Sequence, residues 1–245
     1  MVNPNLTAEV MKKFKPFLDD VLAAYEEGID SIHITGSSLT TDFDPNTSDV
    51  NSVIVLKNMN LEFLTILAPL GKKYGKKEIA APLIMTPQYI RESLDVFPIE
   101  FLNFKLLHHT IFGEDVFQQL EIKKSDLRYQ CERELKVKLI GLRQGYISAV
   151  GNQKIITENF INSIVAYIPL FRSIIFLLGE EPPIHNNDVL ANLQEATDVN
   201  TDAFKTVLKA KIERKKLNME QLNTLFKDYY ATTERLGVII DGIAE

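Results

Sequence analysis

One stretch of the sequence carries the residue types and spacing best suited to chemistry. A predicted strand at residues 31–35 runs into Thr35-Gly36-Ser37-Ser38, and a second strand at 49–56 opens with Ser48-Asp49-Val50-Asn51. Glycine lets a backbone approach a phosphate closely, and exposed amides and the Ser37 hydroxyl can donate hydrogen bonds to phosphate oxygens. Residues two apart on a strand project to one face, so side chains 49 and 51 point toward whatever the glycine turn holds. The stretch therefore predicts a polyphosphate site.

Composition limits the class of protein that carries this stretch. The chain has 245 residues and 45% apolar side chains, which is enough to bury a core without disulfides or structural metal. Its 27 basic and 33 acidic side chains give a net charge of −6 and are interspersed. We therefore expect no nucleic-acid partner, because a net-acidic surface repels phosphate.

The single cysteine, Cys131, has no second thiol for an internal disulfide, which fits a reducing compartment. The first fifteen residues lack the basic flank, apolar stretch and cleavage site of a signal peptide. We therefore expect a cytoplasmic protein.

Residues 160–178 form an apolar segment about as long as the ~20 residues that a membrane span needs. Asn162, Pro169 and Arg172 interrupt it. A central arginine in lipid costs roughly 3 kcal/mol or more. The sequence therefore favours a helix buried in a helical bundle, and we expect no membrane association.

Residues 1–120 mix helical and strand periodicity. Thr7 is placed to cap a first helix whose apolar side carries Phe14, Leu18, Val21 and Tyr25. Strands are expected at 31–35, 49–56, 79–85 and 98–104, with helices at 61–74 and 88–95 between them. This alternation predicts an α+β domain with a mixed sheet flanked by helices.

Residues 121–245 show helical spacing only, so the sequence predicts an all-α helical bundle as a second domain. Ser125 is placed to cap a long helix, and Asn187 and Thr201 each precede another helical pattern. The Pro182-Pro183 pair separates two bundle helices. His108 and His109 fall in a predicted helical connector just before the boundary.

The stretch between Gly36 and Asn51 resembles the signature of the DNA polymerase beta-like nucleotidyltransferase superfamily. That signature is an apolar residue, Gly and Gly or Ser, then a spacer, then Asp, an apolar residue and Asp or Glu; here the spacer from Ser38 to Ser48 is eleven residues. The loop Asp42-Phe43-Asp44-Pro45 also resembles the loops of small bacterial members. The resemblance covers the first domain, whereas the helical half agrees only in general style with the bundle that many members append.

The resemblance implies transfer of a nucleoside monophosphate from an NTP, with Mg²⁺, to a hydroxyl on a small molecule or protein. Gly36, Ser37, Ser48 and Asn51 would then contact the nucleotide, and Asp49 would hold metal and take part in catalysis. A third carboxylate usually comes from a nearby strand, and Glu100 is the candidate.

The sequence departs from the signature at Asn51, which offers one neutral carbonyl oxygen to a cation that prefers anionic oxygen. If Asn103 rather than Glu100 faces Asp49, two of the three acidic positions are neutral. Two hypotheses therefore stay open: an active nucleotidyltransferase, or a catalytically degenerate protein of the same fold that acts as a nucleotide-binding or protein-interaction module.

Other charged residues can be explained either by a structural role or by a functional one. Arg133, Lys136 and Arg143 share one helix face, which is either a solvated charged stripe or a contact for a triphosphate. Arg172 lies in an apolar helix and needs either a structural ion pair, which we favour, or a ligand phosphate. Asp42 and Asp44 are read as turn residues beside Pro45. The acceptor, the base and the oligomeric state are not determined by these patterns.

Overall fold

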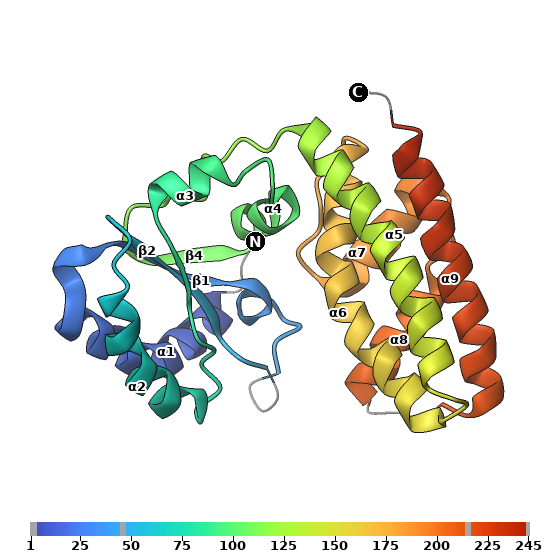
Figure 1. The fold of residues 1–245 in the computed structure, drawn as a ribbon, viewed down its shortest axis with the longest axis horizontal. Coiled ribbons are helices and arrows are strands. Elements are labelled where there is room, and N and C mark those ends of the chain that lie inside the picture. The colour runs from blue at the N-terminus through green and yellow to red at the C-terminus, as the bar shows by residue number, and fades with distance from the viewer. Residues whose placement is uncertain (1–3, 45–47, 214–216, 244–245) are drawn as a thin grey trace. The chain divides into compact units, whose positions relative to one another are not determined.

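The computed structural model describes residues 4–44, 48–213 and 217–243 (Figure 1). The chain divides into two compact units, Met1–Asp95 with Glu100–Glu121 and Val96–Ile99 with Ile122–Glu245. The first unit holds a mixed sheet with helices and the second is helical, so the predicted fold class is confirmed. Pro45 of the predicted loop lies outside the described residues.

The first unit contains the sheet and the helices that support it. Along the chain its elements are α1 (Pro4–Tyr25), η1 (Glu26–Gly28), β1 (Ile29–Thr35), η2 (Gly36–Leu39), β2 (Asn51–Leu56), α2 (Glu62–Gly75), β3 (Leu83–Met85), α3 (Pro87–Glu92), α4 (Pro98–Leu106) and β4 (His108–Gly113), and the first two residues of α4 group with the second unit. The strands follow the order β3-β2-β1-β4. β1 pairs antiparallel with both β2 and β4, whereas β2 and β3 are parallel.

One face of the sheet packs on α1 and α2, which lie together on that side in Figure 1. The core between them is formed by buried apolar residues of the helices and of alternate strand positions, including Phe14, Phe17, Val21, Ile32, Ile34, Ile54, Leu56, Phe63 and Leu67. Because side chains alternate along a strand, the opposite face of β1 receives Ser31, His33 and Thr35. The site described below lies on this second, polar face.

The strand predicted at residues 98–104 is wrong, because this segment forms α4. Pro98 suits the first turn of a helix, where its missing N–H removes no hydrogen bond. The short run of apolar residues fits the periodicity of a strand as well as that of a helix. In the structure the helix buries Ile99, Phe101 and Leu102. The remaining strand is β4, so the helical connector predicted around His108 and His109 is also wrong.

Three predicted boundaries also shift. The strand predicted at 79–85 shortens to β3, with an isolated bridge from Ile79 to Val50. α1 begins at Pro4, so Thr7 lies inside the helix rather than at its start. α5 begins at Lys124, with Lys123 rather than Ser125 at the capping position.

The second unit is a bundle arranged around α6, as predicted from the helical spacing. Its elements are α5 (Lys124–Ser148), α6 (Gln153–Leu177), α7 (Asn186–Thr197), α8 (Asp202–Glu213) and α9 (Met219–Asp241). α6 contacts each of the others, and an aromatic cluster fills the centre, formed by Tyr167, Phe171, Phe204 and Tyr229. Asn218 closes the start of α9 in a capping box with Gln221.

Helix α6 is, within the described part of the chain, the one helix long and apolar enough to cross a membrane. In its most apolar window 61% of the residues are buried inside the bundle, which is weak support for a span. Arg172 within this helix donates to the carbonyls of Pro183 (3.0 Å) and Ile184 (2.7 Å), in the segment between α6 and α7. The guanidinium therefore ties that connection to α6.

Candidate nucleotide site

The predicted site residues lie at the end of the sheet where β1 ends and β2 begins. Thr35, the last residue of β1, pairs directly with Asn51, the first residue of β2. Gly36 and Ser37 continue from one strand into η2, and Asp49 precedes the other by two residues. The register therefore brings the glycine turn and the Asp49–Asn51 segment to the same edge of the sheet.

Gly36 has a backbone conformation that glycine adopts without strain. Its φ is +79°, and a Cβ built there meets no atom within 4 Å, so the turn leaves open space beside it. Its amide donates to the carbonyl of Leu107 (3.0 Å) and is already used within the fold. Ser37 is exposed, whereas Ser38 is buried and its hydroxyl donates to Thr35 O (3.4 Å). Of the predicted phosphate contacts, the Ser37 hydroxyl is therefore the best placed to meet a ligand.

Replacing Gly36 by Ala should lower the free energy of unfolding by roughly 1 kcal/mol or more, because an L-residue is strained at positive φ. Gly71 in α2 is the matched control: it has ordinary helical geometry and open space for a Cβ. Gly71→Ala should raise the stability of the same unit by roughly 0.5–1 kcal/mol. Denaturant unfolding of both variants measures the difference, and equal shifts would show that the turn geometry costs nothing.

The carboxylate set at this edge is small. Asp49 and Asn51 are both exposed, with Val50 buried between them, as expected for alternating side chains. Ser48 is half-buried, and its amide donates to Asp44 O (2.8 Å). On the neighbouring strand, Leu83 pairs with Val53 and so shares the face of Asn51, with 52% of its surface exposed. The position where β3 could supply a carboxylate is therefore apolar.

Glu100 and Asn103 both lie on α4 rather than on a strand, so neither is presented by the sheet beside Asp49 as predicted. The predicted strand is therefore wrong, whereas the metal-binding and catalytic role expected of Glu100 stays a prediction. Glu100 is exposed in the first turn of that helix and Asn103 is half-buried.

The residues present do not fit a centre for two divalent ions. Such a centre needs several anionic oxygens around each pair of cations, and the two alternating positions that open β2 offer Asp49 with the neutral amide of Asn51. Over residues 4–44, 48–213 and 217–243, no group of three or more His, Cys, Asp or Glu side chains is arranged to hold a metal ion.

The structure also shows a buried polar network on the same sheet face, which the sequence analysis missed. His33 on β1 is fully buried, with Nδ1 2.9 Å from Thr110 Oγ1 and Nε2 2.8 Å from Ser31 Oγ. Its ring lies 4.7 Å from that of Phe117, which covers this part of the face. The signal for it was the alternation of Ser31, His33 and Thr35 with Ile32 and Ile34.

His108 on β4 extends this network toward Asp115. Its Nδ1 faces Phe104 O (2.7 Å) and its Nε2 faces both carboxylate oxygens of Asp115 (2.9 Å). Both ring nitrogens of His108 therefore face oxygen atoms that can accept a hydrogen bond. Burial raises the pKa of Asp115, but hydrogen bonds from His108 and from the amides of Gln118 and Phe117 outweigh it, so the pKa is lowered.

His33 responds in the opposite way. Burial, reinforced by the nearby charge of His108, lowers the pKa of His33 to about 4. His33 is therefore neutral at pH 7 and serves as a buried hydrogen-bonding group below the glycine turn. Because His33 is fully buried, its ring cannot contact a ligand directly.

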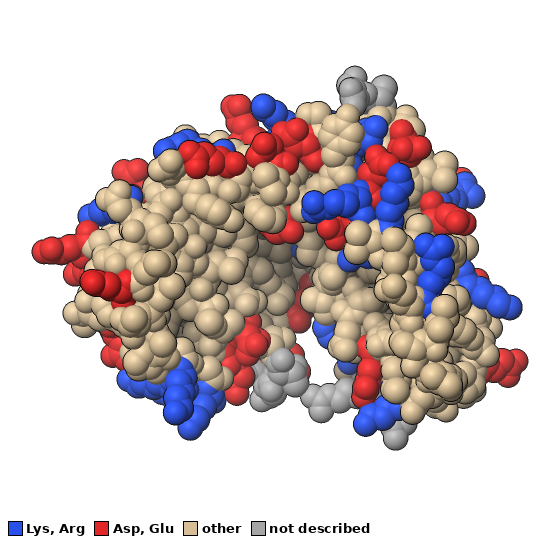
Figure 2. Space-filling view, in the orientation of Figure 1, with Lys and Arg blue, Asp and Glu red and all other residues tan. Residues whose placement is uncertain are grey.

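The charged stripe on α5 is largely paired within the helix. Arg133 contacts Glu134 at 3.3 Å and Lys136 pairs with Glu132, as a solvated stripe would. Arg143 lies over the ring of Tyr230. On the face shown in Figure 2, acidic and basic side chains are interspersed over both units, and one group of basic side chains lies over the end of α2.

No protein-family model and no curated protein match the chain. Among solved structures, it is similar to the crystal structure of spectinomycin adenyltransferase AAD(9) from Enterococcus faecialis with ATP and spectinomycin. The identity is 16% and the TM-score is 0.55, and the match covers 94% of this chain and 98% of that one. The chain therefore has a nucleotidyltransferase-like fold followed by a helical domain, and the likeness extends over both.

Proposed function

We propose that the chain is a catalytically degenerate member of the DNA polymerase beta-like nucleotidyltransferase superfamily that binds a nucleoside triphosphate without transferring its nucleotide. The observation that carries the proposal is the sheet edge itself. Register pairs Thr35 with Asn51, so the Gly36–Ser37 turn and Asp49 share one edge, while Asn51 and Leu83 leave that edge poor in carboxylates.

Binding and transfer make different demands on this edge. A polyphosphate needs hydrogen-bond donors and open space, which Ser37 and the Gly36 turn supply. Nucleotidyl transfer needs anionic groups that hold metal against the reacting phosphate, and loss of even outer metal support costs about 10- to 100-fold. The residues present meet the first demand better than the second.

Nucleotidyl transfer to a small-molecule or protein hydroxyl is the second candidate. It is favoured by the similarity, over both units, to an enzyme whose structure contains ATP and a small-molecule acceptor. Mg²⁺ would be required for this activity. In either case we place the protein in the cytoplasm, in keeping with its single buried cysteine.

The test measures nucleotide binding and transfer on the same protein. Calorimetric titration with ATP, GTP, CTP and UTP should show binding of at least one nucleotide in EDTA, and Asp49→Asn should leave that affinity unchanged or higher. Ser37→Ala should weaken it by at least about tenfold, because a hydrogen bond to a charged group is lost. Ser148→Ala, an exposed serine on α5, is the matched control and should have no effect.

The same protein should not label any acceptor when it is incubated with radiolabelled nucleotides, Mg²⁺ and cell extract. Labelling that is abolished by Asp49→Asn would establish the second candidate instead. Failure of every nucleotide to bind, with or without Mg²⁺, would overturn both.

A further inference from the structure

A cavity of about 370 Å³ lies within the helical unit. It is bounded by α5 and α6, with Phe226 contributed by α9. Its volume falls at the lower end of the range found for small-molecule sites. Most of its wall is apolar, formed by Val137, Leu142, Ile156, Phe160, Ala166 and Phe226.

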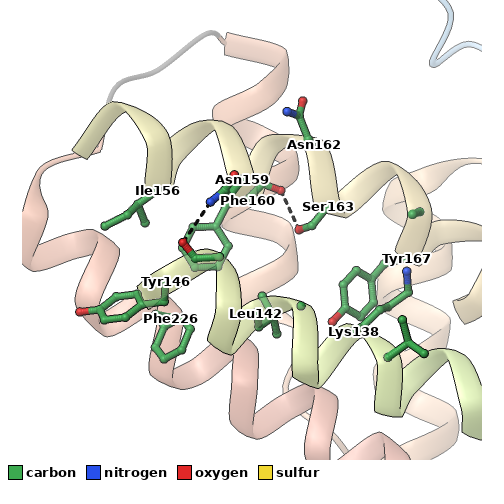
Figure 3. A pocket seen from close by; sticks show the side chains of 14 residues that line it. Lys138, Leu142, Tyr146, Ile156, Asn159, Phe160, Asn162, Ser163, Tyr167 and Phe226 are labelled. Carbon is green, nitrogen blue, oxygen red and sulfur yellow. Dashed lines mark hydrogen bonds between the residues drawn. The ribbon is translucent and has the colours of Figure 1, made fainter. Parts of the chain in front are cut away.

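Figure 3 shows how the polar side chains are distributed around this cavity. Lys138 and Tyr167 lie together at one end, and Tyr146 and Phe226 lie at the other, with Leu142 between them. Asn162 points away from the other labelled side chains. The cavity therefore has an apolar middle and a cation at one end.

The hydroxyl groups of the wall and the amide of Asn159 are hydrogen-bonded within the protein. Tyr146 donates to Asn223 Oδ1 (2.8 Å), Asn159 donates to Gly145 O (3.3 Å), and Ser163 donates to Phe160 O (2.8 Å). Tyr167 shares a hydrogen bond with Thr233 (3.0 Å). These groups shape the cavity, and none of them needs a ligand to complete its hydrogen bonding.

Lys138 differs from them. Its side chain is half-buried, with Nζ 4.6 Å from the centre of the Tyr167 ring. Burial lowers its pKa, and the charge of Glu134, one turn earlier, only partly offsets this effect. Among the residues that the structure describes, no carboxylate lies within 4.0 Å of Lys138 Nζ, whereas Lys136 on the same helix pairs with Glu132. A half-buried ammonium of this kind is stabilised by an anion.

Gly141 adds a second observation. It lies in the middle of α5 and lines the cavity, and a Cβ built there meets no atom within 4 Å. A glycine inside a helix costs roughly 1 kcal/mol relative to alanine. Its effect here is to leave the wall open one turn from Lys138, so space and charge occur together.

We propose that this cavity binds a small amphipathic carboxylate, with its apolar body against Leu142 and Phe160 and its carboxylate on Lys138 Nζ. The size of the cavity suits an aromatic or short aliphatic acid. Such a ligand would give the helical unit a binding function of its own.

The test compares two probes of the same shape, naphthoate and its neutral amide naphthamide, by calorimetric titration of the full chain. Wild-type protein should bind naphthoate at least about tenfold more tightly than naphthamide, because only the acid offers a charge to Lys138. Lys138→Met should reduce this ratio to about one, and Gly141→Leu should abolish binding of both probes by filling the wall. Lys136→Met is the matched control and should keep the wild-type ratio.

Thermal melting followed by circular dichroism checks that each variant is folded. Equal affinity of wild-type protein for the two probes, or a preference that survives Lys138→Met, would overturn the proposal, as would the absence of saturable binding. Sedimentation equilibrium tests whether a second copy of the chain occupies the cavity instead. If the wild-type protein is a dimer and Gly141→Leu dissociates it, the cavity is a dimer contact and the proposed carboxylate site is wrong.

Discussion

Asn51→Asp combined with Leu83→Glu should make nucleotide binding depend on Mg²⁺ by at least about tenfold, a dependence that the wild-type protein should lack. Both side chains lie on the same face of neighbouring strands and both are exposed, so two added carboxylates can join Asp49 without burying charge. Mg²⁺ prefers anionic oxygens, and such support is worth about 10- to 100-fold in metal affinity. The ratio of the dissociation constants in Mg²⁺ and in EDTA, from calorimetry, measures the effect.

Each single variant separates the two contributions. Asn51→Asp alone should raise the ratio by less than the pair does, because the adjacent strand still lacks a carboxylate. Tyr89→Glu, an exposed apolar residue on α3, is the control for added charge and should leave the ratio unchanged. A double variant that binds nucleotide with the wild-type ratio would show that residues 51 and 83 do not face the polyphosphate.

The first unit should lose up to about 3 kcal/mol of stability as the pH falls from about 6.5 to about 4. The unfolded state binds a proton on His33 near the ordinary pKa of 6.5, whereas burial and the charge of His108 hold the folded pKa at about 4. The stabilisation is therefore complete above pH 6.5 and is lost as the pH approaches 4, at about 1.4 kcal/mol per pKa unit. The loss of stability is measured by urea titrations at several pH values, with hydrogen exchange of peptides from β1 as the readout.

His33→Gln should flatten this dependence, because the amide keeps a hydrogen-bonding group but does not titrate. His109→Gln on β4 is the matched control for the same substitution at an exposed position. Asp115 adds its own loss only at lower pH, where its depressed pKa is reached. An unaltered slope in His33→Gln would assign the pH dependence to other groups.

The sequence was most informative where local patterns are strong. β1, β2 and α2 follow from β-branched runs and helical spacing, and their predicted ranges differ from the observed ones by a few residues at most. The segment after Pro98 could not be assigned because its short apolar run suits both periods, and packing of Phe101 and Leu102 decides for the helix. β4 was missed because His108-His109-Thr110 is a weak strand pattern that forms by pairing with β1, far away in the chain.

The residues of the candidate site also differ in how far the sequence could predict them. Gly36, Ser37, Asp49 and Asn51 are close in sequence, so a motif could bring them together, and their roles stay predictions that binding must test. Glu100 was expected on a strand but lies on α4, so its role in the site also stays a prediction. The position of Leu83 beside the site could be recognised only from the parallel register of β3 with β2. The missing information was thus long-range packing for Glu100 and long-range strand pairing for Leu83.

The central position of α6 has a consequence for synthesis of the protein. Residues 153–177 leave the ribosome before α7, α8 and α9, the helices that later cover much of their apolar surface. Until those segments emerge, a nascent chain exposes a stretch apolar enough to attract other hydrophobic surfaces. Truncated products that end before Asn186 should therefore aggregate or be held by chaperones, and the C-terminal helices act as an internal cover for the one that precedes them.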